Sequence, residues 1–256
     1  MLHAPAPHGD LDPLPVRNRL LAALAPEELA RLRPHLELVA PSPGTVLARP
    51  GQPLAHAFFP EAGITSVLVA SANGHGEAEI GLIGREGLVG LPLVLGADAS
   101  PHLYLVQADL RAWRIEAGAL RRAMARCPKL RGALLRYAQA FATQVACTAL
   151  ANAGRRLDER LARWLLMCRD RLDGDDLPLT QPFLSRMLGA HRPGITLAVQ
   201  ALDRAGLIGH GRGRITVLDR AGLEAAARGA YGVPEAEYAR LLGPQPQAAP
   251  DRTAPR

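Results

Sequence analysis

The spacing of hydrophobic residues divides the chain into a strand-rich part and a helix-rich part. Between about residues 37 and 116, short apolar runs are separated by glycine and proline, which predicts strands joined by turns. The expected strands are GTVLARPG (44–51), HAFFPEAGITSVLVAS (56–71), GEAEIGLIG (76–84), GLVGLPLVLG (87–96) and HLYLVQADLRAWRIE (102–116). SANGHG (71–76) carries the Asn-Gly pair typical of a hairpin turn. This spacing predicts a small barrel or sandwich, preceded by a short helix at 20–36.

Helical spacing follows from residue 117, and Pro128 starts a helix of about 25 residues. Its apolar positions recur at steps of three and four, and small residues lie beside them at Ala138, Ala142, Ala146 and Ala149. Such a stripe could belong to a core helix, but its length and single narrow seam favour self-association. The predicted dimer contacts are Leu134, Tyr137, Phe141, Val145 and Thr148. The segment around Gly154 then predicts a break or hinge.

The stretch MLGAHRPGITLAVQALDRAGLI (187–208) has Pro193 and Gly194 inside an apolar helical pattern. Proline is poorly tolerated within a helix but favoured in its first turn. Two helices therefore fit better than one: LTQPFLSRML (179–188), with Thr180 as N-cap, and a second helix from about Arg192. A helix, a glycine-led turn and a second amphipathic helix predict a helix-turn-helix.

The next segment, LIGHGRGRITVLD (207–219), alternates around a glycine-rich turn, as the β-hairpin wing of a winged helix does. Arg212 and Arg214 are expected at its tip. An αα-hairpin packed in an enzyme core is the alternative interpretation of the two helices, and the wing weighs against it. The sequence therefore favours a DNA-binding module.

Charge and composition change this picture little. The net charge is +6, and every basic residue except Lys129 is an arginine, as a GC-rich genome or phosphate binding would each produce. Between Thr180 and Arg220 the sequence contains six arginines and two aspartates, Asp203 and Asp219, which is a modest local excess of +4 in charge. Cys127, Cys147 and Cys168 form no CxxC pair, so we expect free thiols rather than a metal site. The absence of a membrane span or signal peptide predicts a cytoplasmic protein with no membrane partner.

A β-roll, a long helix, LTQPFLSRMLGAHRPGITLAVQALDRAGLI (179–208) and a wing, in this order, resemble the Crp/Fnr family of bacterial transcription regulators. The resemblance covers about residues 17 to 226, and MLGxxRP and GRITVLDRAGLE (213–224) are its specific motifs. It implies an α+β fold with a jelly-roll-like double-stranded β-helix sensor domain, a dimerisation helix and a C-terminal winged helix-turn-helix. The expected division is a disordered N-terminus (1–16), the sensor (17–118), the dimerisation helix (119–154), the DNA-binding domain (155–228) and a flexible tail (229–256).

The resemblance also implies how DNA is read, by a homodimer with one recognition helix in each half of a pseudo-palindrome. Arg192 matches the family arginine that binds guanine, whereas Pro193 and Gly194 replace the usual Glu and Thr or Ser. Pro193 biases Arg192 away from the helical region, so Arg192 could itself be the cap residue. The candidate base contacts are Arg192, Thr196, Leu197 and Gln200, and the candidate phosphate contacts are Thr180, Gln181, His191, Arg212 and Arg214. RNA polymerase is a further possible partner.

Family members that bind cyclic AMP carry a Gly-Glu and, about ten residues later, an Arg-Ser or Arg-Thr. The matching positions here are Gly90, Leu91, Ser100 and Pro101, so the cyclic phosphate would lack its arginine. Cyclic AMP is therefore not expected as the effector, and the cysteines of iron–sulfur members are missing as well. No resident cofactor is predicted, although haem on one of His56, His75 and His102, or an unidentified small effector, stays open.

The predicted function is a dimeric, sequence-specific DNA-binding transcription regulator with no enzymatic activity. The alternative is a cupin-like β-barrel that binds a metal or small molecule, with helices that serve dimerisation. His75, Glu77 and Glu79 offer ligands for such a barrel, but a second histidine two residues after the first is missing. A third alternative is a protein-interaction module, against which Arg192 and the basic wing weigh.

Overall fold

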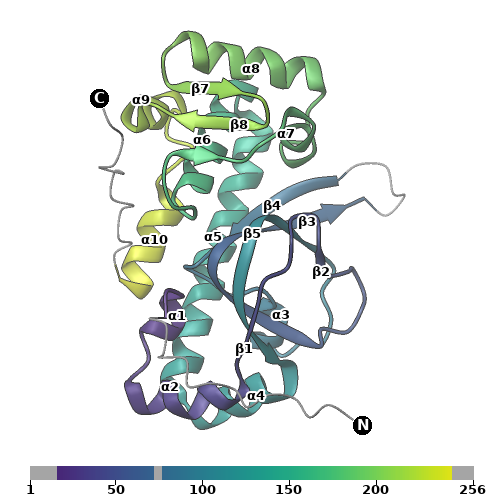
Figure 1. Cartoon of the computed structure of the whole chain (residues 1–256), viewed down its shortest axis with the longest axis vertical. Helices are drawn as coiled ribbons and strands as arrows, with labels where there is room; N and C mark the ends of the chain where they lie inside the picture. The colour runs from purple at the N-terminus through teal and green to yellow at the C-terminus, as the bar shows by residue number, and fades with distance from the viewer. Residues whose placement is uncertain (1–15, 72–76, 244–256) are drawn as a thin grey trace, which may run out of the picture.

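The computed structural model describes residues 16–71 and 77–243, in which a curled antiparallel sheet is linked by a long helix to a smaller helical domain (Figure 1). Five strands form the first sheet in the order β1-β5-β3-β4, with β2 paired to β5. Their bounds are β1 Glu37–Val39, β2 Val46–Ala48, β3 His56–Ala70, β4 Glu77–Ile83 and β5 Leu103–Glu116. β3 and β5 form the centre and pair antiparallel from His56 with Glu116 to Leu68 with Leu103. The predicted hairpin between β3 and β4 lies at 72–76, outside the described residues, although the two strands do pair.

One predicted strand is wrong. Residues 87–96 contain the short helix α3 (Leu91–Val94), which starts after Gly90 at a φ of 107° and has a proline in its first turn. The side chains of Leu91, Leu93 and Val94 are buried. A short apolar run bounded by glycines suits either a buried strand or a buried helix turn, so periodicity could not separate the two.

The N-terminal segment is helical, with α1 (Arg19–Ala22), α2 (Pro26–Leu32) and a 3-10 turn, η1 (Arg33–His35). Pro26 begins α2 as predicted. The side chain of Asn18 caps α1 by accepting hydrogen bonds from Leu20 and Leu21, and its amide donates to the carbonyls of Pro60 and Gly87. This fixes α1 to the sheet. Residues 1–15 of the predicted disordered N-terminus lie outside the described part.

Helix α4 (Ala117–Arg126) leads into the long helix α5 (Pro128–Gly154), with Cys127 between them. Two of the predicted dimer contacts on α5, Leu134 and Tyr137, face inward and are therefore not available to a second copy. Leu134 and Tyr137 are 0% and 2% exposed and pack into the core beneath the sheet. Phe141 packs against the same core, and Thr148 accepts a hydrogen bond from Arg163. Val145 is only partly exposed. Hydrophobic spacing identified one face of α5, but not the neighbour that covers it.

The opposite face of α5 is open. Leu135 is 40% exposed and Leu150 is 70% exposed, and both lie near the small residues noted in the sequence. Further exposed positions on the same side of the helix are Gln139, Ala142, Ala146, Ala149 and Ala153. We call this set, with Leu135 and Leu150, the outer seam of α5.

The C-terminal domain surrounds α6 (Leu157–Arg169) with α7 (Gln181–Met187), α8 (Arg192–Arg204) and α9 (Arg220–Ala226). Its sheet has the order β6-β8-β7, with β6 Asp176–Leu177, β7 Ile208–Gly211 and β8 Arg214–Val217. The sequence predicted the β7–β8 hairpin but not β6. The break after Gly154 is present, since α5 ends there and Arg155 is extended.

The predicted flexible tail (229–256) is wrong for residues 233–242. They form α10 (Val233–Leu242), which runs back along α5 towards α1 (Figure 1). Tyr238 is 5% exposed, and its hydroxyl donates to the carbonyl of Glu86 at 2.9 Å. Residues 244–256 lie outside the described part of the chain.

The main core of the C-terminal domain also includes side chains of the N-terminal sheet. Ile64, Leu68, Leu82 and Leu105 belong to the same buried cluster as Leu161 and Leu165 of α6 and the inner face of α8. The two domains are therefore packed directly on each other.

Candidate nucleic-acid interface

The helix-turn-helix is built from local signals in the sequence. The hydroxyl of Thr180 caps α7 by accepting a hydrogen bond from the Phe183 amide, and Pro182 lies in the first turn. Gly189 takes a φ of 56° in the turn, a backbone conformation that favours glycine. Helix α8 ends in a motif in which the amides of Gly206 and Leu207 donate to the carbonyls of Asp203 and Leu202. The two predicted helices and their turn are confirmed.

The start of α8 differs in one detail from the sequence-based expectation. His191 is the N-cap residue, without a side-chain capping bond, and Arg192 is the first helical residue. A Cβ atom on Gly194 would lie 3.1 Å from Cδ2 of Leu157 in α6, tighter than ordinary van der Waals contact. The close approach of α8 to α6 therefore accounts for a small residue at 194. Ile195, Ala198, Val199 and Leu202 form the buried face of α8, as predicted.

The candidate base contacts lie on the outer face of α8. Arg192, Leu197 and Gln200 are exposed, and Arg192 makes no hydrogen bond or ion pair through its side chain within the described part of the chain. Thr196 is half-buried, and its hydroxyl lies 3.1 Å from both Oε1 of Gln181 and the carbonyl of Arg192. The structure thus brings together one candidate base contact and one candidate phosphate contact.

Four of the candidate phosphate contacts, all except His191, lie at the start of α7 or on the wing. Thr180, Gln181 and Arg214 line a cavity of about 300 Å³ between these two elements. Arg212 lies in the turn between β7 and β8, and its side chain is exposed. Arg214, the first residue of β8, pairs with Asp176 of β6 at 3.0 Å. Arg212 is therefore the freer of the two wing arginines.

Half of the six arginines counted between 180 and 220 are held in ion pairs. Arg186 binds Glu77 of β4 at 2.7 Å, Arg214 binds Asp176, and Arg220 binds Asp170 at 2.7 Å. Arg192, Arg204 and Arg212 form no ion pair with another described residue. The local positive charge that is free to meet DNA is thus smaller than the sequence count indicated, and it is concentrated on α8 and the tip of the wing.

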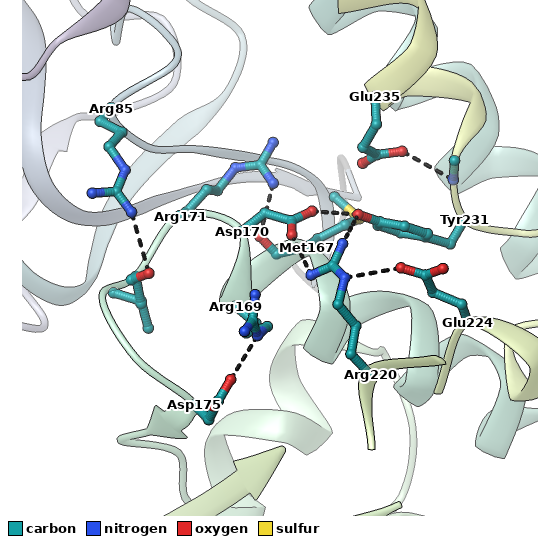
Figure 2. A network of polar contacts seen from close by, with 12 residues as sticks. Arg85, Met167, Arg169, Asp170, Arg171, Asp175, Arg220, Glu224, Tyr231 and Glu235 are labelled. Atoms are coloured by element: carbon teal, nitrogen blue, oxygen red, sulfur yellow. Dashed lines mark hydrogen bonds and ion pairs between the residues drawn. The ribbon is translucent and has the colours of Figure 1, made fainter. Parts of the chain in front are cut away.

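A network of polar residues fastens the C-terminal domain behind this surface (Figure 2). Arg220 at the start of α9 donates to Asp170, to Glu224 and to the hydroxyl of Tyr231. Tyr231 in turn donates to Asp170, and burial is the main reason that the pKa of Tyr231 is raised. These contacts join the end of α6 to α9 and to the segment that leads into α10.

Deeper in the molecule, Arg171 and Glu86 form a buried ion pair at 2.8 Å, with side chains 7% and 5% exposed. Arg171 also donates to the carbonyl of Met167. The pair joins the loop after β4 to the end of α6. A charge pair buried this deeply depends on both partners, because removal of one leaves the other without compensation.

A second buried contact joins the two domains through β4. The indole nitrogen of Trp164 donates to Oε1 of Glu79 at 2.6 Å. Burial raises the pKa of Glu79 to about 7, although hydrogen bonds from Ser66 and Trp164 act in the opposite direction. Glu79 is thus a buried group close to half protonation at neutral pH. Its partner is 85 residues away in sequence, and the sequence offered no sign of this contact.

The residues at the positions of the cyclic AMP cassette are built into the fold. Leu91 is 6% exposed in the hydrophobic core, and Gly90 lies against Ala57. Ser100 is 1% exposed, and its hydroxyl accepts a hydrogen bond from the His102 amide, while Pro101 is exposed. Apolar side chains of several strands form a buried cluster, which includes Phe58, Val67, Ile83, Val89, Tyr104 and Val106.

Two further findings concern residues 16–71 and 77–243. No helix in these ranges is both long enough and apolar enough to span a membrane. No three His, Cys, Asp or Glu side chains in the same ranges are placed to hold a metal ion. His75, which the cupin-like alternative would use with Glu77 and Glu79, lies between the two ranges and so outside the described residues.

Comparison with known proteins identifies the C-terminal domain and the fold. Residues 159–226 match the model of the Crp-like helix-turn-helix domain. A transcriptional regulator of the Crp/Fnr family from Eubacterium rectale is similar in structure, with a TM-score of 0.63 at 19% identity, over 82% of this chain and 97% of that one. FixK2 from Bradyrhizobium japonicum gives a TM-score of 0.65 at 14% identity, over 75% and 96% of the two chains.

A Crp/Fnr-family regulator from Thermus thermophilus gives a TM-score of 0.61 at 21% identity, over 76% of this chain and 100% of that one. No curated protein matches the sequence. The predicted α+β fold, with its N-terminal antiparallel sheet, long helix and helix-turn-helix, is confirmed by these likenesses. The similar structures are transcription regulators rather than enzymes.

Proposed function

We propose that this chain, which carries a Crp-like helix-turn-helix domain on the fold of the Crp/Fnr regulators, is a sequence-specific DNA-binding transcription regulator. The observation that carries the proposal is the outer face of α8. Its first residue, Arg192, is exposed and has no side-chain partner among the described residues, and the inner face of the helix packs into a hydrophobic core. A helix held in this way fits the major groove of B-form DNA.

In this proposal Arg192 reads guanine, because its guanidinium offers two parallel donors to the O6 and N7 acceptors. Gln200 lies about two turns further along α8 and matches the acceptor and donor of adenine, while the exposed Leu197 suits the methyl group of thymine. Thr196 contributes by fixing Gln181 of α7, since its hydroxyl donates to that side chain.

The phosphates flanking each half-site would be held by the start of α7 and by the wing. Thr180 and Gln181 lie beside Arg214 around one cavity, and Arg212 extends from the turn. His191, exposed just before α8, is a further candidate hydrogen-bond donor to a DNA phosphate. Such contacts position the protein without reading sequence.

We place the homodimer contact on the outer seam of α5 rather than on the inward stripe. Leu135 and Leu150 are large apolar side chains exposed to solvent, and the alanines between them allow a second helix to approach closely. Two copies joined here would present two recognition helices to a pseudo-palindromic site.

Cyclic AMP is not proposed as the effector. Leu91 stands at the position of the family glutamate, and its side chain lies in the core. No arginine directly precedes Ser100, and the next residue is Pro101. A cyclic phosphate would have no cationic partner at these positions.

The test is selection of bound sequences from a random duplex pool, followed by titration of the full-length protein with the selected and a scrambled duplex. We expect a preference of at least roughly 10³ for the selected site at physiological salt, and an affinity that falls steeply with salt. Equal affinity for both duplexes would contradict the proposal. As a control, Arg212→Ala should weaken binding to all duplexes alike and reduce the salt slope by about 1.

A further inference from the structure

A cavity of about 610 Å³ lies at the base of the long helix, where α2 meets the elbow between α4 and α5. It is formed by the inner side of α2, the face of α4 and the first turn of α5 around Cys127 and Leu130. Its volume is within the range of small-molecule sites in proteins, about 300 to 1,000 Å³. It shares no residue with the cassette positions Gly90, Leu91, Ser100 and Pro101.

The floor of this cavity is apolar. Leu32 and Leu130 are 3% and 1% exposed, and Leu24 and Ala119 are buried beside them. Ala123 also lines the cavity and keeps it open, because a larger side chain at that position would occupy the space. Such a floor favours a hydrocarbon or ring over a fully hydrated ion.

The rim of the cavity is cationic. Arg31, Arg122 and Arg126 line it, are exposed, and form no hydrogen bond or ion pair with other residues of the described ranges. Glu28 is the acidic lining residue, but its carboxylate already accepts from the Ala25 amide and lies 3.8 Å from Lys129. The thiol of Cys127 donates to the same carboxylate at 3.4 Å. The lining thus contains three arginines and one glutamate whose carboxylate is already bound by other groups, which leaves an excess of positive charge at the mouth of the cavity.

We propose that this cavity binds an amphipathic organic anion, with its apolar body on the leucine floor and its carboxylate or phosphate head between Arg31, Arg122 and Arg126. Guanidinium groups match both heads, since each offers two oxygens to the forked donors. A neutral or cationic molecule of the same length lacks this match. The inference does not depend on DNA binding, because it rests on the lining of the cavity alone.

Calorimetric titration of the full-length protein with decanoate and with decyl phosphate, both below their aggregation concentrations, tests the proposal. We expect one molecule of probe bound per chain, and binding of either probe supports the site and identifies the head it accepts. Decyltrimethylammonium and inorganic phosphate should each bind at least about tenfold more weakly, because each lacks one half of the match. Equal binding of inorganic phosphate would overturn the proposal by reducing the site to a patch for simple anions.

Substitutions distinguish the contribution of the rim arginines to binding from that of the apolar floor. Arg122→Ala combined with Arg126→Ala should weaken decanoate binding about tenfold or more, equivalent to about 1.4 kcal/mol. Arg121→Ala is the matched control, because Arg121 is on the same helix, is exposed and does not line the cavity. Ala123→Phe should block binding while all three arginines stay in place.

Circular dichroism melts of each variant check that the fold is retained. Unchanged decanoate affinity in both the double arginine variant and Ala123→Phe would overturn the proposal, as would absence of binding of decanoate and decyl phosphate to the natural sequence.

Discussion

The two residues that follow Arg192 determine how helix α8 begins. Pro193 fits the first turn of α8, where its missing amide costs no hydrogen bond, and Gly194 allows α8 to approach Leu157. The guanidinium itself is exposed and has no partner among the described residues. Its role can therefore be tested without disturbing the fold.

We expect Arg192→Ala to lower affinity for the selected duplex by about 1–3 kcal/mol and to relax the preference at one base pair in each half-site. Arg192→Lys keeps the charge but loses the fork, so it should restore affinity for bulk DNA without restoring that preference. Competition binding against duplexes varied at single positions measures both effects. A loss that is uniform over all sequences would identify Arg192 as a phosphate contact instead.

Glu79 makes stability depend on pH in an unusual direction for a carboxyl group. Its pKa is raised by burial from 4.5 to about 7 in the folded protein. The folded state therefore binds more protons than the unfolded state between these values, and the free energy of unfolding falls as pH rises from about 4.5 to 7.

The size of this effect is on the order of 3 kcal/mol. Glu79→Gln keeps an acceptor for the indole of Trp164 but cannot ionise, so its unfolding free energy should change less over the same interval. Urea melts of both proteins at about pH 5 and about pH 7.5 measure the difference. Parallel pH profiles would show that Glu79 does not titrate in this range.

At the scale of elements, α10 links the C-terminal end of the chain to the N-terminal half. It packs along α5, and Tyr238 donates to the carbonyl of Glu86, the residue that pairs with Arg171. Glu235 of α10 is largely buried near the same arginine, and burial raises its pKa. Helix α10 therefore covers a buried charge pair as well as apolar surface.

Tyr238→Ala should reduce the free energy of unfolding by about 3 kcal/mol or more, because it empties a buried site over α5. Tyr238→Phe removes only the hydroxyl and should cost about 1 kcal/mol. Chemical denaturation with matched slopes compares the two. Equal stability of the alanine variant and the natural sequence would mean that α10 does not support the fold.

Some elements could be predicted from the sequence because their signals are local. The helix-turn-helix depends on Thr180, Gly189, Pro193 and Gly206, each of which acts within a few residues of its own position. The strand predicted at 87–96 and the flexible tail predicted at 233–242 were wrong because a short apolar run, or a short amphipathic one after a glycine, fits more than one structure.

Long-range pairing accounts for the rest. Two buried pairs, Glu86 with Arg171 and Glu79 with Trp164, join residues that are far apart in sequence. The sequence around either partner does not indicate which residue it will contact. The same limit applies to α5, whose two faces were visible as patterns while their neighbours were not. The outer face of α8 could be predicted from the sequence, because the spacing of its apolar residues indicates which face is buried and therefore which face is exposed.

At the scale of the whole molecule, the two copies of the proposed homodimer would meet at the outer seam of α5. Ala142→Arg combined with Ala146→Glu should place long charged side chains on this seam and give monomers, with DNA affinity reduced at least about tenfold. Substitution of the exposed Arg136, on the same helix but about 100° away from the seam, is the control. Light scattering after size exclusion measures the mass. A dimer that survives the double substitution would show that the copies meet elsewhere.

The core shared between the sheet and α6 determines how the chain can be divided. Ile64, Leu68, Leu82 and Leu105 would become exposed if the C-terminal domain were removed, and α6 would lose the surface it packs on. The helix-turn-helix domain is therefore not expected to fold properly when it is fused to another protein, although the motif itself is compact. A chimera that keeps residues 155–243 on a foreign sensor would need matching apolar residues there, or it would aggregate. A change to one domain therefore requires coordinated substitutions in the core shared by the sheet and α6, rather than exchange of a whole domain.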